Sequence, residues 1–148
     1  MIELRKITED NFLDAFHLKL APGQDRFVSH PIRSLAQAYV YREQCQPFGI
    51  YAGETMVGYV MVIYDHDIPE YDIWHMMIVE SCQRRGYGSA ALDRVLDYIR
   101  TKPLGTSDRV ALTCSRENMP ALRLYKSKGF AETGAADGDE IELALTLT

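Results

Sequence analysis

The chain has 148 residues, 47% of them hydrophobic and 25% charged, with a formal net charge of -5. A chain of this length can bury a core of its own, so residues 1–148 are predicted to form a single domain. The acidic balance argues against a nucleic-acid partner, and no apolar run approaches the length needed to cross a membrane.

The N-terminal half is predicted to place two helices between a first strand and a hairpin. Residues 2–7, "IELRKI", alternate apolar and polar side chains, which is typical of a strand. A helix is predicted over 8–20, because the threonine at its start can cap it, and a second over 34–44. The apolar runs 48–52 and 56–64, separated by a turn, predict a β-hairpin.

The C-terminal half alternates strands and helices before a final hairpin. A long apolar strand is predicted over 71–79, followed by a helix over 86–100 and a buried strand over 109–114. "NMPALRLYKSKGF" (118–130) predicts a short helix stopped by its glycine. The last segment turns around Asp137–Gly138 as a hairpin. This order predicts an α/β or α+β fold with helices packed on one central mixed sheet.

The hexapeptide "QRRGYG" (83–88) joins the long strand to the next helix, and we call it the elbow. A strand, a glycine-containing loop and a helix form the geometry that binds phosphate, because the first helical amides are unpaired. Gly86 and Gly88 carry no Cβ to obstruct an anion. Arg84 and Arg85 would add positive charge or simply be solvated. A plain turn is the alternative, and no Walker motif fits, because Gly88 is followed by Ser-Ala.

The helix after the last buried strand carries a second candidate pair. Asn118 and Tyr125 are seven residues apart, two helical turns, and therefore share a face. Such a face can present an amide and a phenol to one ligand. A helix cap and a core tyrosine would explain the same pair.

Together these segments resemble the GNAT superfamily of acetyl-CoA-dependent N-acetyltransferases. The family pattern [QR]-x-x-G-x-[GA] is met by residues 83–88, and N-x-x-A-x-x-x-Y-x-x-x-G-F is met about 35 residues later by 118–130. The predicted element order also matches. The resemblance implies a single GNAT-like domain with a mixed, mostly antiparallel sheet, one splayed strand pair and about four helices.

The resemblance also implies a position for the co-substrate, acetyl-CoA, where the strands over 71–79 and 109–114 splay apart. Amides of the elbow would hold the pyrophosphate, and backbone amides near Met77 and Ile78 would bind the pantetheine and polarise the thioester carbonyl. No metal is expected. The implied cofactor-binding residues are Met77, Ile78, Gln83, Arg84, Arg85, Gly86, Tyr87, Gly88, Ser89 and Asn118.

The same resemblance supplies two catalytic candidates. Tyr125 matches the family's general acid, which protonates the sulfur of CoA. By motif offset, Asp72 falls where some members carry a catalytic base, with ordered water as the alternative base. Strand alternation predicts His75 on the opposite face of the sheet from Asp72, which it groups with Trp74, Met76 and Ile78.

The acceptor is predicted to be a small-molecule amine. "GQDRFVSHPIRSLAQAYVY" (23–41) resembles the bacterial spermine/spermidine acetyltransferase subgroup at Gln24, Phe27, Val28, Ser34, Leu35, Ala36 and Ala38. It departs from that subgroup at "SHP" (29–31), Arg26 and Arg33. The acidic run "DHDIPEYD" (65–72) is either an ammonium partner or a solvated loop. Another small amine, such as an aminoglycoside-like drug or an amino acid, and a non-catalytic acetyl-CoA sensor are the alternatives.

The cysteines and the N-terminal segment bear on the compartment, and the family resemblance bears on the assembly. Cys45, Cys82 and Cys114 form no CxxC pair, which argues against a disulfide framework and a zinc site. The N-terminal segment has no apolar signal core, so a cytoplasmic location is expected. The family resemblance makes a homodimer plausible.

Overall fold

The computed structural model describes residues 1–27 and 29–148. Its strands and helices follow the predicted order, and two short 3-10 turns, Gln24–Arg26 and Glu80–Cys82, lie between them. The elements are β1 (Ile2–Lys6), α1 (Phe12–Phe16), α2 (Pro31–Val40), β2 (Cys45–Ala52), β3 (Thr55–Asp65), β4 (Glu70–Ile78), α3 (Tyr87–Arg100), β5 (Arg109–Ser115), α4 (Met119–Ser127), β6 (Ala131–Asp137) and β7 (Glu140–Thr146).

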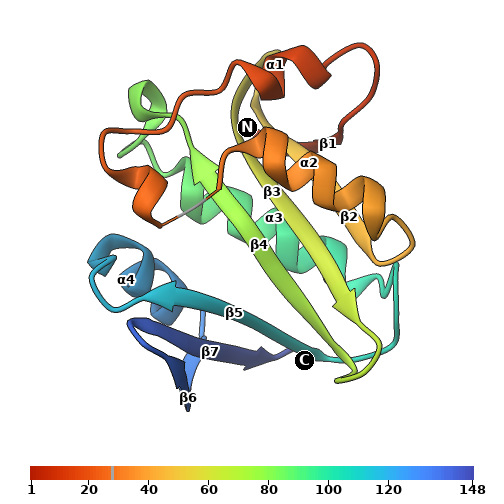
Figure 1. Ribbon diagram of the computed structural model, residues 1–148, viewed down its shortest axis with the longest axis vertical. Helices are drawn as coiled ribbons and strands as arrows, with labels where there is room; N and C mark the ends of the chain where they lie inside the picture. Colours follow the sequence, from red (N-terminus) through yellow and green to blue (C-terminus); the bar gives the residue numbers. More distant parts are fainter. Residues whose placement is uncertain (28) are drawn as a thin grey trace.

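One seven-stranded sheet runs through the fold in the order β1-β2-β3-β4-β5-β7-β6. Neighbouring strands are antiparallel except β4 and β5, which are parallel and are joined by two residue pairs, Tyr71 with Val110 and Asp72 with Ala111. Beyond these pairs the two strands diverge (Figure 1). The predicted mixed, mostly antiparallel sheet with one splayed pair is therefore confirmed.

The helices cover both faces of the sheet, with α1 and α2 in front of β2 and β3 and α3 behind the sheet in Figure 1. The larger apolar cluster includes Val95 and Ile99 of α3 and packs against one face of the sheet. The smaller cluster packs under α1 and α2. There the buried Tyr59 hydroxyl donates to Ser34 Oγ at 2.8 Å, which fixes α2 on β3. Each large side chain buried in this way contributes about 1.5–3 kcal/mol.

A β-bulge interrupts β4 at His75. Tyr59 pairs with Met77 and Met61 with Trp74, so three steps along β4 match two along β3. The extra residue, His75, has a left-handed φ of 58°. The bulge reverses the alternation of side chains beyond it. The prediction that Met76 and Ile78 share a face with Asp72 is therefore wrong: both pack with the larger cluster, and Met77 packs with the smaller one.

The first helix is much shorter than predicted. It spans Phe12–Phe16 rather than 8–20, and Thr8 does not act as its cap. Instead the Thr8 amide donates to Asn11 Oδ1 at 2.7 Å, forming a polar turn before the helix. After the helix, Gly23 adopts a left-handed φ of 80°. Because α1 ends at Phe16, residues 21–27 lie outside the helix and are available to line the cavity described below.

The second helix begins three residues before the predicted start and ends at Val40 rather than Gln44. His30 Nδ1 accepts the Ile32 amide at 3.1 Å as an N-cap, and Pro31 occupies the first helical position, where its missing N–H costs nothing. No helix within residues 1–27 and 29–148 is long and apolar enough to cross a membrane.

Candidate active site

A cavity of about 550 Å³ opens where β4 and β5 separate. The C-terminal ends of both strands line it, together with the elbow, the first turn of α3, one face of α4 and the segment before α2. Most of the predicted cofactor-binding residues contribute to the wall, namely Met77, Ile78, Gln83, Arg84, Gly86, Tyr87, Gly88 and Asn118, and so does Tyr125. Arg85 and Ser89 do not line it.

The backbone of Ile78 faces this cavity. Val79 donates its N–H to Val57 O at 2.8 Å, across to β3. Because successive residues of a strand point their backbone groups to opposite sides, Ile78 directs its N–H and C=O away from β3. Its carbonyl accepts a hydrogen bond from Gln83 Nε2 at 2.8 Å. Of the two backbone amides that the resemblance implies for the thioester, that of Ile78 faces the cavity, whereas Met77 pairs with Tyr59 on β3.

The elbow leaves unpaired donors at the start of α3. Gly86 is the N-cap, with a φ of 79°, and among the described residues no side chain caps the helix. The first helical hydrogen bond runs from the Ala90 amide to Gly86 O at 3.1 Å, so the amides of 87–89 precede it. A Cβ built on Gly86 would meet nothing within 4 Å. The space beside Gly86 is thus open, and the helix dipole favours an anion at the unpaired amides that follow it.

Tyr125 and Asn118 share one face of α4, as predicted, and both line the cavity. Tyr125 is half-buried and packs edge-on against Phe130, with ring centroids 6.0 Å apart. Burial, reinforced by the nearby Cys114 thiol, raises the pKa of Tyr125 well above its usual value. The phenol therefore keeps its proton at neutral pH. Asn118 Oδ1 accepts from the Ala121 amide at 3.5 Å and so caps the helix.

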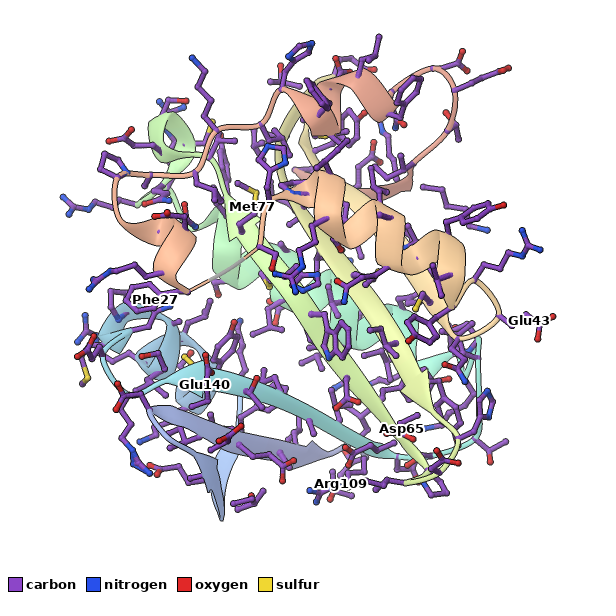
Figure 2. All side chains as sticks on the ribbon, viewed as in Figure 1. Phe27, Glu43, Asp65, Met77, Arg109 and Glu140 are labelled. Atoms are coloured by element: carbon purple, nitrogen blue, oxygen red, sulfur yellow. The ribbon has the colours of Figure 1, made fainter. Side chains whose placement is uncertain are left out.

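The segment before α2 forms the wall opposite α4. Gln24 Oε1 accepts the Ala21 amide at 2.8 Å and lies 3.5 Å from Gln83 Nε2. Arg26 Nη1 lies 3.9 Å from Glu117 Oε2, which follows β5 on the other side of the cavity. Figure 2 shows Phe27 beside α4, at the same edge. Of the other residues in the stretch resembling the polyamine subgroup, Ser34 and Ala38 are buried in the core, and Val28 lies outside the described residues.

Sequence reasoning missed the contribution of β5. Thr113, Cys114 and Ser115 line the cavity from that strand. Burial and the nearby Glu140 carboxylate raise the pKa of the buried Cys114 thiol to about 11, so it stays uncharged. The sequence predicted that β5 diverges from β4. To identify these three lining residues, it would also have been necessary to know which side chains at the end of β5 point toward β4. Strand alternation alone leaves that facing open.

Asp72, the candidate base, does not line this cavity. It lies in a second cavity of about 330 Å³ between α2 and the ends of β3 and β4. Burial raises the pKa of Asp72 to about 7, and the neighbouring Glu70 and Asp65 carboxylates act in the same direction. The structure thus separates Asp72 from Tyr125, which the sequence had placed in one mechanism.

Comparison with known proteins agrees with this geometry. The model of the acetyltransferase (GNAT) family matches residues 6–130. The chain belongs to this family. The predicted enzyme class, an N-acetyltransferase, is thereby confirmed.

Relatives of this GNAT enzyme differ in the acceptors that they are named for. Spermine/spermidine N(1)-acetyltransferase of Bacillus subtilis is 26% identical over 145 residues, covering 92% of this chain and 91% of that protein. Spermidine N-acetyltransferase of Vibrio cholerae, solved with CoA and spermine, has a TM-score of 0.77 at 19% identity, covering 98% of this chain and 95% of that one. The ribosomal-protein-S18-alanine N-acetyltransferase of Escherichia coli has a TM-score of 0.74 at 21% identity, covering 100% and 95%.

Proposed function

We propose that this GNAT enzyme transfers the acetyl group of acetyl-CoA to a primary amine of a small cationic acceptor, a polyamine of the spermidine or spermine type. The observation that carries the proposal is the convergence of the splayed strands, the elbow amides and Tyr125 on one cavity. The Bacillus subtilis relative, named for spermine and spermidine, supports the acceptor class. Another small amine is the alternative acceptor, and a sensor that binds acetyl-CoA without turnover is the alternative function.

The residues present fit acetyl-CoA. The pyrophosphate is an anion, and the unpaired amides of 87–89 with the adjacent Arg84 supply donors and positive charge for it. The cavity then follows the free edge of β4 toward Ile78. In this proposal Asn118 and Met77 contact the pantetheine arm, while Arg85 and the Ser89 side chain act from outside the cavity.

The chemistry needs a neutral amine, a stabilised carbonyl oxygen and a proton for the departing sulfur. The amine nitrogen forms a bond to the acetyl carbon, and the carbon–sulfur bond breaks. The Ile78 amide donates to the carbonyl oxygen as negative charge develops there. Tyr125 gives its proton to the sulfur. Its raised pKa keeps the phenol protonated until that step. Because Asp72 opens onto the other cavity, we assign the removal of the amine proton to water.

Several further expectations belong to the same proposal. We treat residues 1–148 as one N-acetyltransferase domain that works without a metal, and gel filtration of the purified protein tests whether it forms a homodimer. A cytoplasmic location is supported by Cys45, Cys82 and Cys114, which are free thiols. Neither nucleic acid nor a membrane has a role in it.

The deciding experiment is calorimetric titration with acetyl-CoA, followed by thiol release with spermidine in the same sample. Binding with turnover supports the proposal. Binding with turnover only on an amino acid, an aminoglycoside or a peptide bearing an N-terminal alanine would move the acceptor class. Binding without turnover on any amine would favour the sensor. No binding of acetyl-CoA would overturn the proposal.

A further inference from the structure

The second cavity adjoins the first along β4. Trp74 lines the second cavity and Met77 lines the first, both on the side of the sheet that α2 covers, and the bulge residues His75 and Met76 lie between them. Three residues of a strand span about 10 Å, a separation that an extended aliphatic chain can cover. The second cavity is closed by α2 on one side and by the β3–β4 turn at its end. Figure 2 shows Asp65 at that turn, at the same end of the sheet as Arg109.

The lining carries negative charge that the protein does not neutralise. Asp65, Asp67 and Asp72 all line the cavity, and within the described residues none of them forms a salt bridge. Arg109, whose charge interacts with that of Asp72, is already engaged, since its Nε lies 2.7 Å from Glu70 and its Nη2 lies 3.3 Å from Glu142. Asp65 Oδ1 accepts the amides of Asp67 and Ile68, and Asp72, with a pKa of about 7, is partly protonated at neutral pH. A positive ligand would favour the ionised form of Asp72 and pair with carboxylates that have no cation beside them.

The rest of the lining suits an organic cation. Gln37 Oε1 is a buried acceptor in the cavity wall and has no hydrogen-bond donor among the described residues. An ammonium group is a donor only, so it can pair with the carboxylates, and with this oxygen once the Gln37 side chain turns toward the cavity. Trp74 and Tyr41 keep 38% and 55% of their surface exposed and offer aromatic faces to a cation.

We propose that the second cavity holds a distal ammonium group of an elongated polycationic acceptor whose reacting amine lies beyond His75, in the first cavity. The inference rests on the proposed function and deepens it. It makes Asp72 a specificity residue that recognises the length and charge of the acceptor, in place of a catalytic base. A monoamine would react in the first cavity without engaging Asp72.

Thiol-release kinetics with spermidine and with butylamine test the inference in wild type, Asp72→Asn and Gln37→Met. Asp97→Asn, on the exposed face of α3, is the matched control for loss of one negative charge. We expect Asp72→Asn to raise the KM for spermidine about tenfold while leaving kcat and the KM for butylamine unchanged. Gln37→Met should raise the KM for spermidine by a smaller factor. Asp97→Asn should leave kcat and KM unchanged for both amines.

Equal loss of kcat with both amines would make Asp72 part of the chemistry and overturn the inference, as would unchanged kinetics with both. If wild type turns over no amine, the proposed function fails, but the cavity is still tested by calorimetric titration with spermidine. Binding that Asp72→Asn weakens would support the cavity as an ammonium site. Absent binding, or binding that the substitution leaves unchanged, would overturn it.

Discussion

The side-chain amide of Gln83 donates a hydrogen bond to the carbonyl oxygen of Ile78 at 2.8 Å. The first residue of the elbow thereby holds the last residue of β4. The Ile78 backbone faces the cavity, and its amide is the donor that we assign to the thioester carbonyl. Gln83 is for this reason a positioning residue, which holds the donor in place without contacting the reacting atoms.

Replacing Gln83 by leucine should disturb that donor. The Ile78 carbonyl would lose its partner, at a cost of about 1–3 kcal/mol if it stays dry, and the peptide would be free to rotate. We expect kcat to fall several-fold, whereas the KM for the amine is expected to stay near the wild-type value. Gln83→Glu is the companion variant; it accepts rather than donates when ionised, so it should not restore kcat. Wild-type kcat in Gln83→Leu would contradict the positioning role.

Gly86→Val should weaken acetyl-CoA binding by tenfold or more. The valine would be strained at a φ of 79°, by about 1–2 kcal/mol, and its side chain would occupy the open space over the elbow amides. Gly134→Val is the matched control, because Gly134 has a φ of 92°, open surroundings and a position on the exposed β6. Calorimetric titration should show wild-type affinity for the control. Equally weakened acetyl-CoA binding in the two variants would mean that backbone strain alone explains the loss. Wild-type affinity in Gly86→Val would contradict the role of the elbow.

Tyr125→Phe should lower kcat by about 10²-fold or more while acetyl-CoA still binds, as expected for loss of a general acid. Tyr98→Phe removes a phenol from α3, away from the cavity, and should leave kcat unchanged. Because burial raises the pKa of Tyr125, wild-type kcat should show no decline from its ionisation up to about pH 10. A decline between pH 7 and 9 that Tyr125→Phe abolishes would show that the phenol ionises there.

Asp72→Asn should stabilise the protein at pH 8 and not at pH 4. The folded-state pKa of Asp72 is raised from 3.8 to about 7, so the folded protein binds a proton more tightly than the unfolded chain. Its contribution to the free energy of unfolding therefore falls as pH rises through that interval. Removing the charge should recover about 1 kcal/mol or more at pH 8. Urea unfolding at both pH values measures the change in the free energy of unfolding, with Asp97→Asn as control. Equal effects at pH 4 and pH 8 would contradict the raised pKa.

Local sequence signals predicted the order of elements and the elbow well, because Gly86 and Gly88 leave few alternatives for a strand-to-helix turn. They failed where tertiary contacts decide. The bulge at His75 depends on the register between β3 and β4, which no local pattern of β4 encodes. Alternation was therefore carried through it, and Met76 and Ile78 were put on the wrong face.

The separation of Asp72 from Tyr125 has the same origin. The motif offset gave the distance of Asp72 from the elbow along the chain, but not which cavity its carboxyl group would enter. Helical periodicity predicted that Asn118 and Tyr125 share a face, and the family resemblance supplied the role of Tyr125. A pair of residues on one helix can be placed from sequence, whereas a residue on β4 and one on α4 can be related only through the tertiary packing between the two elements.

The two residue pairs between β4 and β5 also bear on how the protein moves. They join a half-sheet of β1–β4 to another of β5–β7, and the lower local protection of such a seam should appear as fast amide hydrogen exchange along its free edges. A molecule seated between the halves would supply contacts to both that the sheet itself lacks. Occupancy of the cleft would then set the rigidity of the whole sheet, so that the co-substrate is also a structural element of the working enzyme.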